Sequence, residues 1–236
     1  MVLTVQALLF DTFGTVVDWR DSVLAELVAF GAARGIDIDW TRFLTEWKAG
    51  YRPGMDRVNS GEWPWTTVET IYRRRLDEIL PQHGIEGLGD ADLAHLTRAW
   101  WRLHPWPDAV PGLRRLRTRF ILSPLSNGSF AGMVHLARFA GLPWDCILTA
   151  ENARCYKPRP ETYQTAVALL GLRPAEVMMV AAHNYDLAAA RRCGLGTAFV
   201  PRPTEYGPGQ TSDLAPTADW DVIAADFLDL ARQLET

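Results

Sequence analysis

Short apolar runs alternate with helix-like stretches along most of the chain, and this alternation strongly constrains the fold. The first run, residues 5–10, is apolar at five of six positions and leads directly into Asp11. Such a run is typical of a strand buried on both faces of a parallel sheet. Further strands are expected at 120–125, 146–149, 177–182, 197–200 and 220–223, with helices at 109–118, 129–141, 160–171, 184–193 and 224–234. The alternation predicts an α/β fold with a doubly wound parallel sheet.

The stretch from residue 19 to residue 100 differs, because it contains no convincing strand. Helices are expected near 20–34, 40–51, 65–80 and 90–103. Six of the ten tryptophans lie here, and they are expected either as the core of this segment or as the lining of a small apolar pocket: Trp19, Trp40, Trp47, Trp63, Trp65 and Trp100. The sequence therefore predicts a core domain of residues 1–18 and 101–236, with residues 19–100 inserted as a helical cap domain over the carboxyl edge of the sheet.

The composition is that of an ordinary globular protein, with 48% hydrophobic and 22% charged residues in a chain of 236. A net charge of −4 argues against a nucleic-acid partner, because an acidic surface repels phosphates. No apolar stretch reaches the roughly 18 to 20 residues that span a bilayer, and no basic leader is expected at the N-terminus. The cysteines, Cys146, Cys155 and Cys193, lack metal-ligand spacing, so reduced thiols in a cytoplasmic protein are expected.

Polar groups follow two of the predicted strands. Asp11 comes directly after the first strand, where a carboxylate is either a catalytic nucleophile or the cap of a turn. Ser126 and Asn127 follow the second core strand, where they would bind an anion or cap the next helix. Because ligands bind at the carboxyl ends of parallel strands, these three side chains are expected at one site.

A cation and a second carboxylate occur later in the chain. Only two of the 24 basic residues are lysines, Lys48 and Lys157. Lys157 would keep Asp11 ionised if it lay nearby, and otherwise it is a solvated surface residue. Asp186 would orient Lys157 or a hydrolytic water, or else it stabilises the start of the following helix through the macrodipole.

These groups, in this order, resemble the motifs of the haloacid dehalogenase (HAD) superfamily. The motifs read here as Asp11-x-x-Gly14-Thr15, Ser126-Asn127, Lys157-Pro158 and an acidic loop that ends at Asp186. The resemblance covers essentially the whole chain. It implies a HAD-like Rossmannoid core with an inserted helical cap.

Two positions separate the chain from the magnesium-dependent phosphatases of that superfamily. Those enzymes carry an acid–base aspartate two residues after the nucleophile, whereas this chain has Phe13, which neither donates nor accepts a proton. They also carry further acidic residues in the fourth motif, where Asp186 is the only carboxylate here, and Mg²⁺ favours several oxygen ligands. The chain most resembles the L-2-haloacid dehalogenases, in which a bulky residue follows the nucleophile at the spacing of Phe13.

This resemblance implies hydrolysis of short 2-haloalkanoic acids to 2-hydroxy acids without a metal or other cofactor. Asp11 would attack the carbon that bears the halogen, and water would then hydrolyse the resulting Asp11 ester. The polar network implied around Asp11 consists of Lys157, Asp186 and Tyr163. The resemblance implies that Ser126 and the backbone N–H groups of Thr12 and Phe13 hold the substrate carboxylate, and that Asn127 contacts the leaving halide. The implied ligands are a small-molecule 2-haloacid and a halide ion, and related proteins are often homodimers.

Two parts of the site depart from the family pattern. A cap arginine binds the halide in the family, whereas Lys48 stands there in this chain, and Arg52, one helical turn on, is a second candidate. In the fourth motif, His183 stands where the family often has asparagine, so it is predicted to position or activate the hydrolytic water. Asn184 and Tyr185 are assigned to substrate binding, with Tyr185 in the halogen pocket.

The chain resembles a subgroup of the family that carries Ala-Ala-His-Asn-Tyr-Asp in this loop and a loop of the type Arg-Pro-Thr-Glu-Tyr-Gly-Pro-Gly later, as at 202–209 here. Some relatives in the family accept fluoroacetate. Turnover of haloacetates, including fluoroacetate, in a compact tryptophan-rich pocket is therefore a further hypothesis. Two alternatives stay open, a HAD-type phosphatase for a small phosphate ester and a catalytically idle HAD-fold binding protein. Magnesium-dependent turnover of aryl phosphates would favour the first, and tolerance of Asp11→Asn would favour the second.

Overall fold

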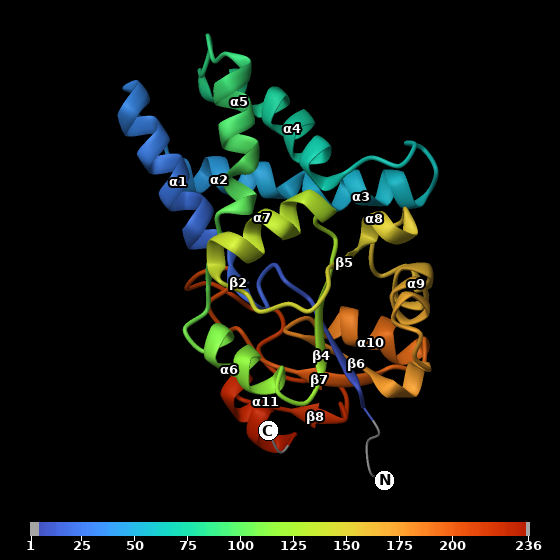
Figure 1. Cartoon of the computed structure of the whole chain (residues 1–236). Coiled ribbons are helices and arrows are strands. Elements are labelled where there is room, and N and C mark those ends of the chain that lie inside the picture. The colour runs from blue at the N-terminus through green and yellow to red at the C-terminus, as the bar shows by residue number, and fades with distance from the viewer. Residues whose placement is uncertain (1–4, 235–236) are drawn as a thin grey trace.

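The structure is a computed structural model that describes residues 5–234, so residues 1–4 and 235–236 of the predicted core domain lie outside the described residues. Its main sheet has six strands in the order β5-β4-β1-β6-β7-β8, and every neighbouring pair is parallel. The strands are β1 (Ala7–Phe10), β4 (Ile121–Ser126), β5 (Leu148–Thr149), β6 (Val177–Ala181), β7 (Gly196–Phe199) and β8 (Val222–Ile223). The predicted α/β fold with a parallel sheet is therefore confirmed (Figure 1).

Side chains of β1 alternate between two apolar cores, one on each face of the sheet. Leu8 and Phe10 belong to the core that includes α6 (Ala109–Leu116) and α11 (Phe227–Gln233). Ala7 and Leu9 belong to the core that includes α9 (Pro160–Leu170) and α10 (Asn184–Arg192), and the short helix α8 (Ala150–Ala153) packs on α9. Each fully buried leucine contributes roughly 1.5–3 kcal/mol, so burial on both faces determines the register of the strand and directs its end, at Asp11, toward the site.

Between β1 and β4 the chain forms a helical insert, which lies above the sheet in Figure 1. Its helices are α1 (Trp19–Arg34), α2 (Trp40–Ala49), α3 (Tyr51–Asn59), α4 (Val68–Ile79), η1 (Pro81–His83), α5 (Asp90–Thr97) and η2 (Arg98–Trp101). The insert begins after β2 (Val17–Asp18) and ends before β3 (His104–Pro105), and these two strands pair antiparallel. The chain therefore enters and leaves the insert side by side. Helix α7 (Phe130–Ala140), which follows β4, packs against η2.

The helix expected at 40–51 is shorter than predicted, and α3 was not predicted at all. The Gly50 N–H bonds to the Trp47 carbonyl three residues back at 3.2 Å, which ends α2 in a tighter turn, and α3 begins at Tyr51. A Cβ on Gly50 would lie 2.5 Å from Cγ of Arg75, so the close approach of α4 requires glycine at this break. Lys48 and Arg52 consequently lie on two different helices rather than on one helical face.

The tryptophans of the insert mainly form its core. Trp47 and Trp100 are completely buried, and the Trp100 ring stacks on Tyr72 with 4.0 Å between ring centroids. The indole N–H of Trp47 donates to the Tyr72 carbonyl at 2.8 Å, which satisfies its one polar group. This agrees with the first of the two roles expected for these residues.

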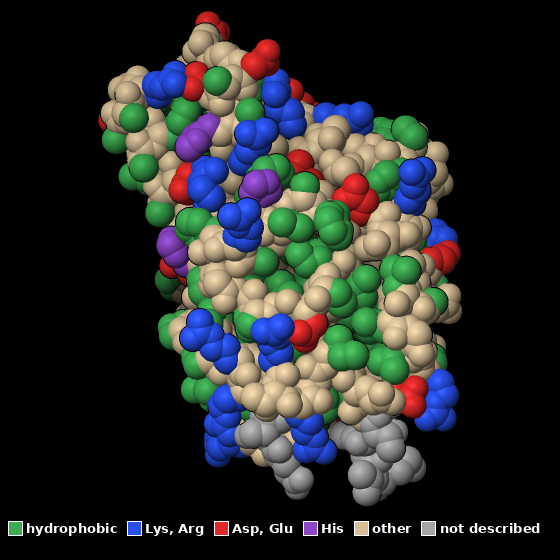
Figure 2. Space-filling model, in the orientation of Figure 1, with side chains coloured by type: hydrophobic (Ala, Val, Ile, Leu, Met, Phe, Trp, Pro, Cys, Tyr) green, Lys and Arg blue, Asp and Glu red, His purple; other side chains and the backbone are tan. Residues whose placement is uncertain are grey.

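Within residues 5–234, no helix is both long enough and apolar enough to cross a membrane. On the face shown in Figure 2, Lys and Arg side chains occur from the helical insert to the lower end of the sheet, with Asp and Glu side chains among them. Charges on this face are therefore mixed rather than gathered by sign.

Candidate active site

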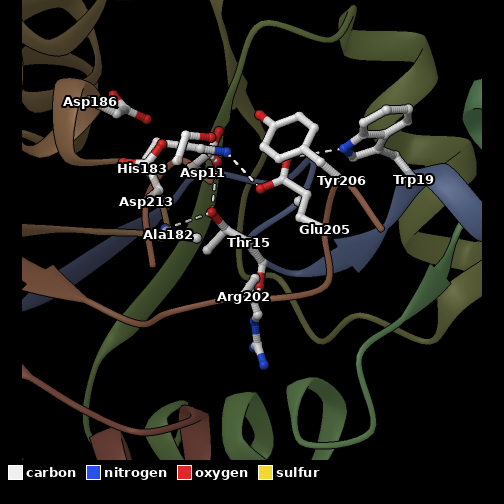
Figure 3. Close-up of polar contacts among 12 residues, drawn as sticks. Asp11, Thr15, Trp19, Ala182, His183, Asp186, Arg202, Glu205, Tyr206 and Asp213 are labelled. Atoms are coloured by element: carbon white, nitrogen blue, oxygen red, sulfur yellow. Dashed lines mark hydrogen bonds and ion pairs between the residues drawn. The ribbon is translucent and has the colours of Figure 1, made fainter. Parts of the chain in front are cut away.

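Three segments that follow strands meet above the carboxyl edge of the sheet (Figure 3). Asp11 follows β1, Asn127 follows β4, and His183 stands before α10, two residues after the end of β6. The loop after β7 brings Glu205 to the same place, where it bonds to His183. The sheet thus assembles groups that are far apart in the sequence, as expected for an α/β fold.

Lys157 lies between two buried carboxylates. Its Nζ is 3.0 Å from Oδ1 of Asp11 and also donates to Oδ2 of Asp186, whose other oxygen accepts a hydrogen bond from the Tyr163 hydroxyl. Burial alone would lower the pKa of Lys157, but the charges of Asp11 and Asp186 outweigh it and raise that pKa. Lys157 is therefore a permanent cation, and the alternative of a solvated surface lysine is wrong because its side chain is 1% exposed.

The second oxygen of Asp11 has two further partners. Oδ2 accepts a hydrogen bond from the Thr15 hydroxyl at 2.7 Å and lies 2.9 Å from Nδ1 of His183. Burial raises the pKa of Asp11, yet the charges and hydrogen bonds of Lys157 and His183 dominate and hold that pKa below its usual range. Asp11 is thus an ionised carboxylate at neutral pH, as a nucleophile must be.

His183 also contacts a carboxylate that the sequence patterns did not indicate. Its Nε2 lies 2.9 Å from Oε2 of Glu205, and the indole N–H of Trp19 donates to Oε1 of Glu205 at 3.0 Å. Burial would lower the pKa of His183, but the hydrogen bonds and charges of Asp11 and Glu205 raise it well above the ordinary value. In the sequence, Glu205 stands in a Pro-rich loop after a core strand, where ligand-binding groups commonly occur, and in the 202–209 stretch that resembles a subgroup of the family. Neither observation assigned it a role.

Asp11 opens onto a cavity of about 260 Å³ between the sheet and the insert. The cavity is lined by Asp11, Phe13, Lys48, Ala49, Tyr51, Arg52, Met55, Asn127, His183, Tyr185, Glu205 and Tyr206. Its size suits a small organic acid rather than a large ligand. The expected tryptophan-rich lining is wrong, because the aromatic rings along this wall are Phe13 and three tyrosines, while the tryptophans pack behind them.

Two cations of the insert reach the cavity. Nζ of Lys48 lies 3.9 Å from the centre of the Tyr51 ring and 4.9 Å from that of Trp19, which stabilises the ammonium by cation–π contact. Burial lowers the pKa of Lys48 to about 8, although the charges of Glu205 and Asp11 oppose this shift. Arg52 is half exposed, pairs with Asp56 at 3.1 Å, and has its guanidinium carbon 5.8 Å from the centre of the Tyr185 ring.

Not every predicted site residue lines the cavity. Thr12 and Ser126 are completely buried at the ends of β1 and β4, and the Ser126 hydroxyl oxygen accepts the Gly128 N–H at 3.1 Å. The Thr12 hydroxyl is a buried polar group for which residues 5–234 provide no hydrogen-bond partner. Asn127 does line the cavity, and its Oδ1 accepts the Lys157 N–H at 2.8 Å.

Asn184 differs from the prediction. Its amide Nδ2 donates to Asp213 at 2.8 Å and to the Ala215 carbonyl at 3.0 Å, and its Oδ1 accepts from Thr217 N–H and the Trp220 indole. All of its polar capacity is therefore used to hold the 213–220 segment, and it does not line the cavity. Asn184 is a structural residue because the first turn of α10 points it away from His183 and Tyr185.

Within the described part of the chain, residues 5–234, no three His, Cys, Asp or Glu side chains are grouped as metal ligands. Lys157 instead bridges the candidate nucleophile, Asp11, to Asp186, and His183 bridges Asp11 to Glu205. The positive charge beside Asp11 is thus supplied by side chains of this chain.

Comparisons with known proteins agree with this geometry. A family described as haloacid dehalogenase-like hydrolase matches residues 5–194. The structure is similar to that of the L-2-haloacid dehalogenase PA0810, with 47% identity, a TM-score of 0.95 and coverage of 98% of this chain and 99% of that chain. It is similar also to the defluorinating L-2-haloacid dehalogenase Rha0230, with 45% identity, a TM-score of 0.96 and coverage of 98% and 96%.

The (S)-2-haloacid dehalogenase of Xanthobacter autotrophicus is 30% identical over 84% of this chain and 76% of its own length. The family match, over residues 5–194, includes Asp11, Asn127, Lys157 and His183. The chain therefore belongs to the L-2-haloacid dehalogenase family of the HAD-like hydrolases.

Proposed function

We propose that the protein hydrolyses the carbon–halogen bond of short 2-haloalkanoic acids, including haloacetates, through an ester on Asp11 and without a metal ion. The observation that carries this proposal is an ionised, buried aspartate that faces a small cavity and is bonded to Lys157 and His183. Relatives with 30% to 47% identity are named as 2-haloacid dehalogenases, which supports this substrate class.

In the first step, an oxygen of Asp11 attacks the carbon that bears the halogen and the halide leaves with the bonding electrons. A halide is a weak base, so it needs solvation rather than a proton. This explains why Phe13, a residue without acid–base capacity, is acceptable two positions after the nucleophile. Lys48, Arg52 and Asn127 line the cavity and are proposed to bind the departing halide or the substrate carboxylate.

In the second step, water attacks the carbonyl carbon of the Asp11 ester and releases the 2-hydroxy acid. His183 is proposed as the base that accepts the water proton, since its Nδ1 lies 2.9 Å from an Asp11 oxygen. Lys157 stays beside Asp11 throughout, and its charge would stabilise the oxyanion that develops during hydrolysis. Tyr163 and Asp186 hold Lys157 in place.

We also propose that residues 19–100 act as a cap domain over a core of residues 1–18 and 101–236. The insert contributes Lys48, Tyr51 and Arg52 to the cavity, and the core contributes Asp11 and His183. A cavity shared in this way excludes water when the substrate is bound, which increases the reactivity of the Asp11 carboxylate.

Halide release is the direct test. The purified protein is expected to release chloride from 2-chloropropionate and from chloroacetate at an unchanged rate in the presence of a chelator. Chelator-sensitive hydrolysis of an aryl phosphate instead would show a phosphatase, and the absence of any turnover would favour a binding protein. Fluoride release from fluoroacetate is expected as well, and release of chloride alone would reject that extension.

The charge of Lys48 makes halide binding dependent on pH. Because the pKa of Lys48 is about 8, its ammonium is positive below this pH and loses its charge as the pH rises through it. The inhibition constant for chloride is therefore expected to rise roughly tenfold as Lys48 loses its charge, which corresponds to about 1.4 kcal/mol of binding free energy. The measurement is the inhibition of turnover by added chloride at pH values between about 6 and 10. Arg52, the other cavity cation from the insert, keeps its charge over that range, so it does not contribute to the change.

Two variants test whether Lys48 causes this pH dependence of chloride inhibition. Lys48→Arg is expected to keep halide binding constant with pH, and Lys48→Met is expected to bind weakly at every pH. A wild-type inhibition constant that does not change with pH would contradict a role for Lys48.

A further inference from the structure

We propose that Glu205 is a positioning residue for ester hydrolysis, which holds the His183 ring with its proton on Nε2 so that Nδ1 faces the Asp11 ester as the base. This inference rests on the proposed function and extends it to a residue for which neither the sequence motifs nor the family resemblance gives a role. It also explains how His183 can lie beside the Asp11 carboxylate as a cation in the first step and act as a base in the second.

The geometry places His183 between two carboxylates in a nearly closed site. Nδ1 is 2.9 Å from Oδ2 of Asp11 and Nε2 is 2.9 Å from Oε2 of Glu205. His183 is 5% exposed and Glu205 is 2% exposed, so water competes little for either hydrogen bond. A neutral imidazole that donates from Nε2 to Glu205 must present the lone pair of Nδ1 to Asp11.

The loop that carries Glu205 is fixed to the nucleophile segment. Both Nη atoms of Arg202 bond to the Asp108 carboxylate at 2.8 Å, and its Nε donates to the Thr15 carbonyl at 2.9 Å. This bidentate pair is largely buried, with side-chain exposures of 8% for Arg202 and 12% for Asp108. These contacts of Arg202 therefore hold the loop in place three residues before Glu205.

Gly14 provides the space that the Glu205 carboxylate occupies. A Cβ at residue 14 would lie 2.1 Å from Oε1 and 2.2 Å from Cδ of Glu205, and the φ of Gly14 is +86°. Any larger residue in this motif would displace the carboxylate from His183. With the indole of Trp19 on Oε1, the two oxygens of Glu205 have separate partners, which fixes the plane of the carboxylate (Figure 3).

The order of the two steps follows from charge. In the resting site, imidazolium lies between two anions, which together raise the pKa of His183 even though burial opposes the charge. Esterification of Asp11 removes one of these anions, so the Nδ1 proton is released to solvent while Glu205 retains Nε2–H. The other ionisable groups that line the cavity with His183 are Lys48, Tyr51, Arg52, Tyr185 and Tyr206. Esterification also removes the attraction of the Asp11 charge that raises the pKa of Lys48.

The hydrolytic step then balances. The oxygen of water bonds to Cγ of Asp11, and Nδ1 of His183 takes the proton that this water loses. The bond between Cγ and the alkoxy oxygen breaks, and the 2-hydroxy acid leaves with the proton from Nδ1. The Asp11 carboxylic acid that remains then gives its proton to Nδ1, which restores the carboxylate and the imidazolium of the resting site. Glu205 keeps its hydrogen bond to Nε2 throughout and stabilises the imidazolium that forms transiently.

The test is Glu205→Gln, which keeps the size of the side chain and removes its charge. With its amide oxygen on Trp19, the glutamine would donate an N–H to Nε2 and force the ring proton onto Nδ1. Ester formation is expected to change less than about tenfold, whereas steady-state turnover falls about 10²- to 10⁴-fold, the range for loss of a general base. Rapid mixing with 2-chloropropionate should give one equivalent of chloride per site, and intact-protein mass should show the accumulated ester.

Glu205→Asp distinguishes this role from a packing role. Aspartate retains the negative charge but shortens the side chain, so the proposal expects it to hydrolyse the ester faster than Glu205→Gln does. A packing role expects the reverse, because glutamine fills the space and aspartate does not. Hydrolysis is followed as the decay of the accumulated ester, so only the folded, ester-forming fraction of each variant enters this comparison.

Glu86→Gln, the same chemical change at an exposed loop position, is the matched control and should behave as the wild type. His183→Asn should also accumulate ester, and the double variant with Glu205→Gln should be no slower than the single variants. Ester hydrolysis at the wild-type rate in Glu205→Gln would overturn the role of Glu205 and leave the proposed function intact. No halide release by the wild type would overturn the proposed function itself.

Discussion

Asp11→Asn is expected to reduce halide release by roughly 10⁴-fold or more, the scale seen when a covalent nucleophile is removed. The amide has no negative oxygen with which to attack carbon. Thr15, Lys157 and His183 do not replace the nucleophile, because the polar group of each of them is directed at the carboxylate oxygens of residue 11. The fold should survive, since asparagine has nearly the same shape and the neighbouring Lys157 keeps Asp186 as a partner.

A single turnover in ¹⁸O-labelled water identifies the nucleophile in the wild type. With enzyme in excess over 2-chloropropionate, the label should enter the carboxylate of Asp11 and not the hydroxyl of the product. Label found directly in the product would mean that water attacks the carbon, and Asp11 would then not be a nucleophile. Halide release by Asp11→Asn at the wild-type rate would lead to the same conclusion.

Lys157→Met is expected to destabilise the protein strongly at neutral pH. It removes the cation shared by Asp11 and Asp186 and leaves two carboxylates in an almost closed site. Removing one partner of a buried ion pair typically costs about 3–5 kcal/mol of unfolding free energy. Urea denaturation of the wild type and the variant at pH 7 measures the difference.

The deficit of Lys157→Met is expected to shrink in acid. In the wild type the pKa of Asp11 is lowered by folding, so its contribution is present above the usual aspartate pKa and is lost as the pH falls. Without Lys157 the carboxylates are harder to ionise in the folded protein, so acid favours the folded variant. The two stability curves should therefore converge as the pH falls below about 4, where the wild type begins to lose this contribution.

Arg42→Met is a matched control, because Arg42 lies on an exposed face and, among residues 5–234, its side chain pairs only with Glu46 on the same helix. An exposed pair at this spacing contributes little, so its loss should leave stability nearly unchanged at both pH values. A Lys157→Met variant as stable as this control would show that the buried cation is not needed to hold the two carboxylates.

The sequence pattern predicts the strands because a strand buried on both faces must be apolar along its length. Ala7 to Phe10 have this property, and the polar residue that follows, Asp11, had to lie at the edge of the sheet. The same reasoning placed Asn127 and His183 at strand ends, and the structure brings both to the Asp11 cavity. The break at Gly50 escaped the pattern because it depends on the approach of Arg75 from another helix.

The sequence pattern could not predict the direction in which each side chain of the site points. His183, Asn184 and Tyr185 are consecutive, yet Asn184 turns to the 213–220 segment while its neighbours line the cavity. Each residue of a helix is rotated by about 100° from the one before, so the use of a polar residue depends on which segment lies opposite it. That segment is brought there by the fold of the C-terminal part of the chain.

The order and chemistry of Asp11, Lys157 and Asp186 were encoded locally, since each follows a strand or precedes a turn that its own neighbours specify. The contacts of Lys48 with the Trp19 ring and of Glu205 with His183 were decided by packing, because they join segments that only the folded chain brings within 3 Å to 5 Å of one another. A hydrogen bond depends on distance and angle in space, and no spacing along the sequence records either of them.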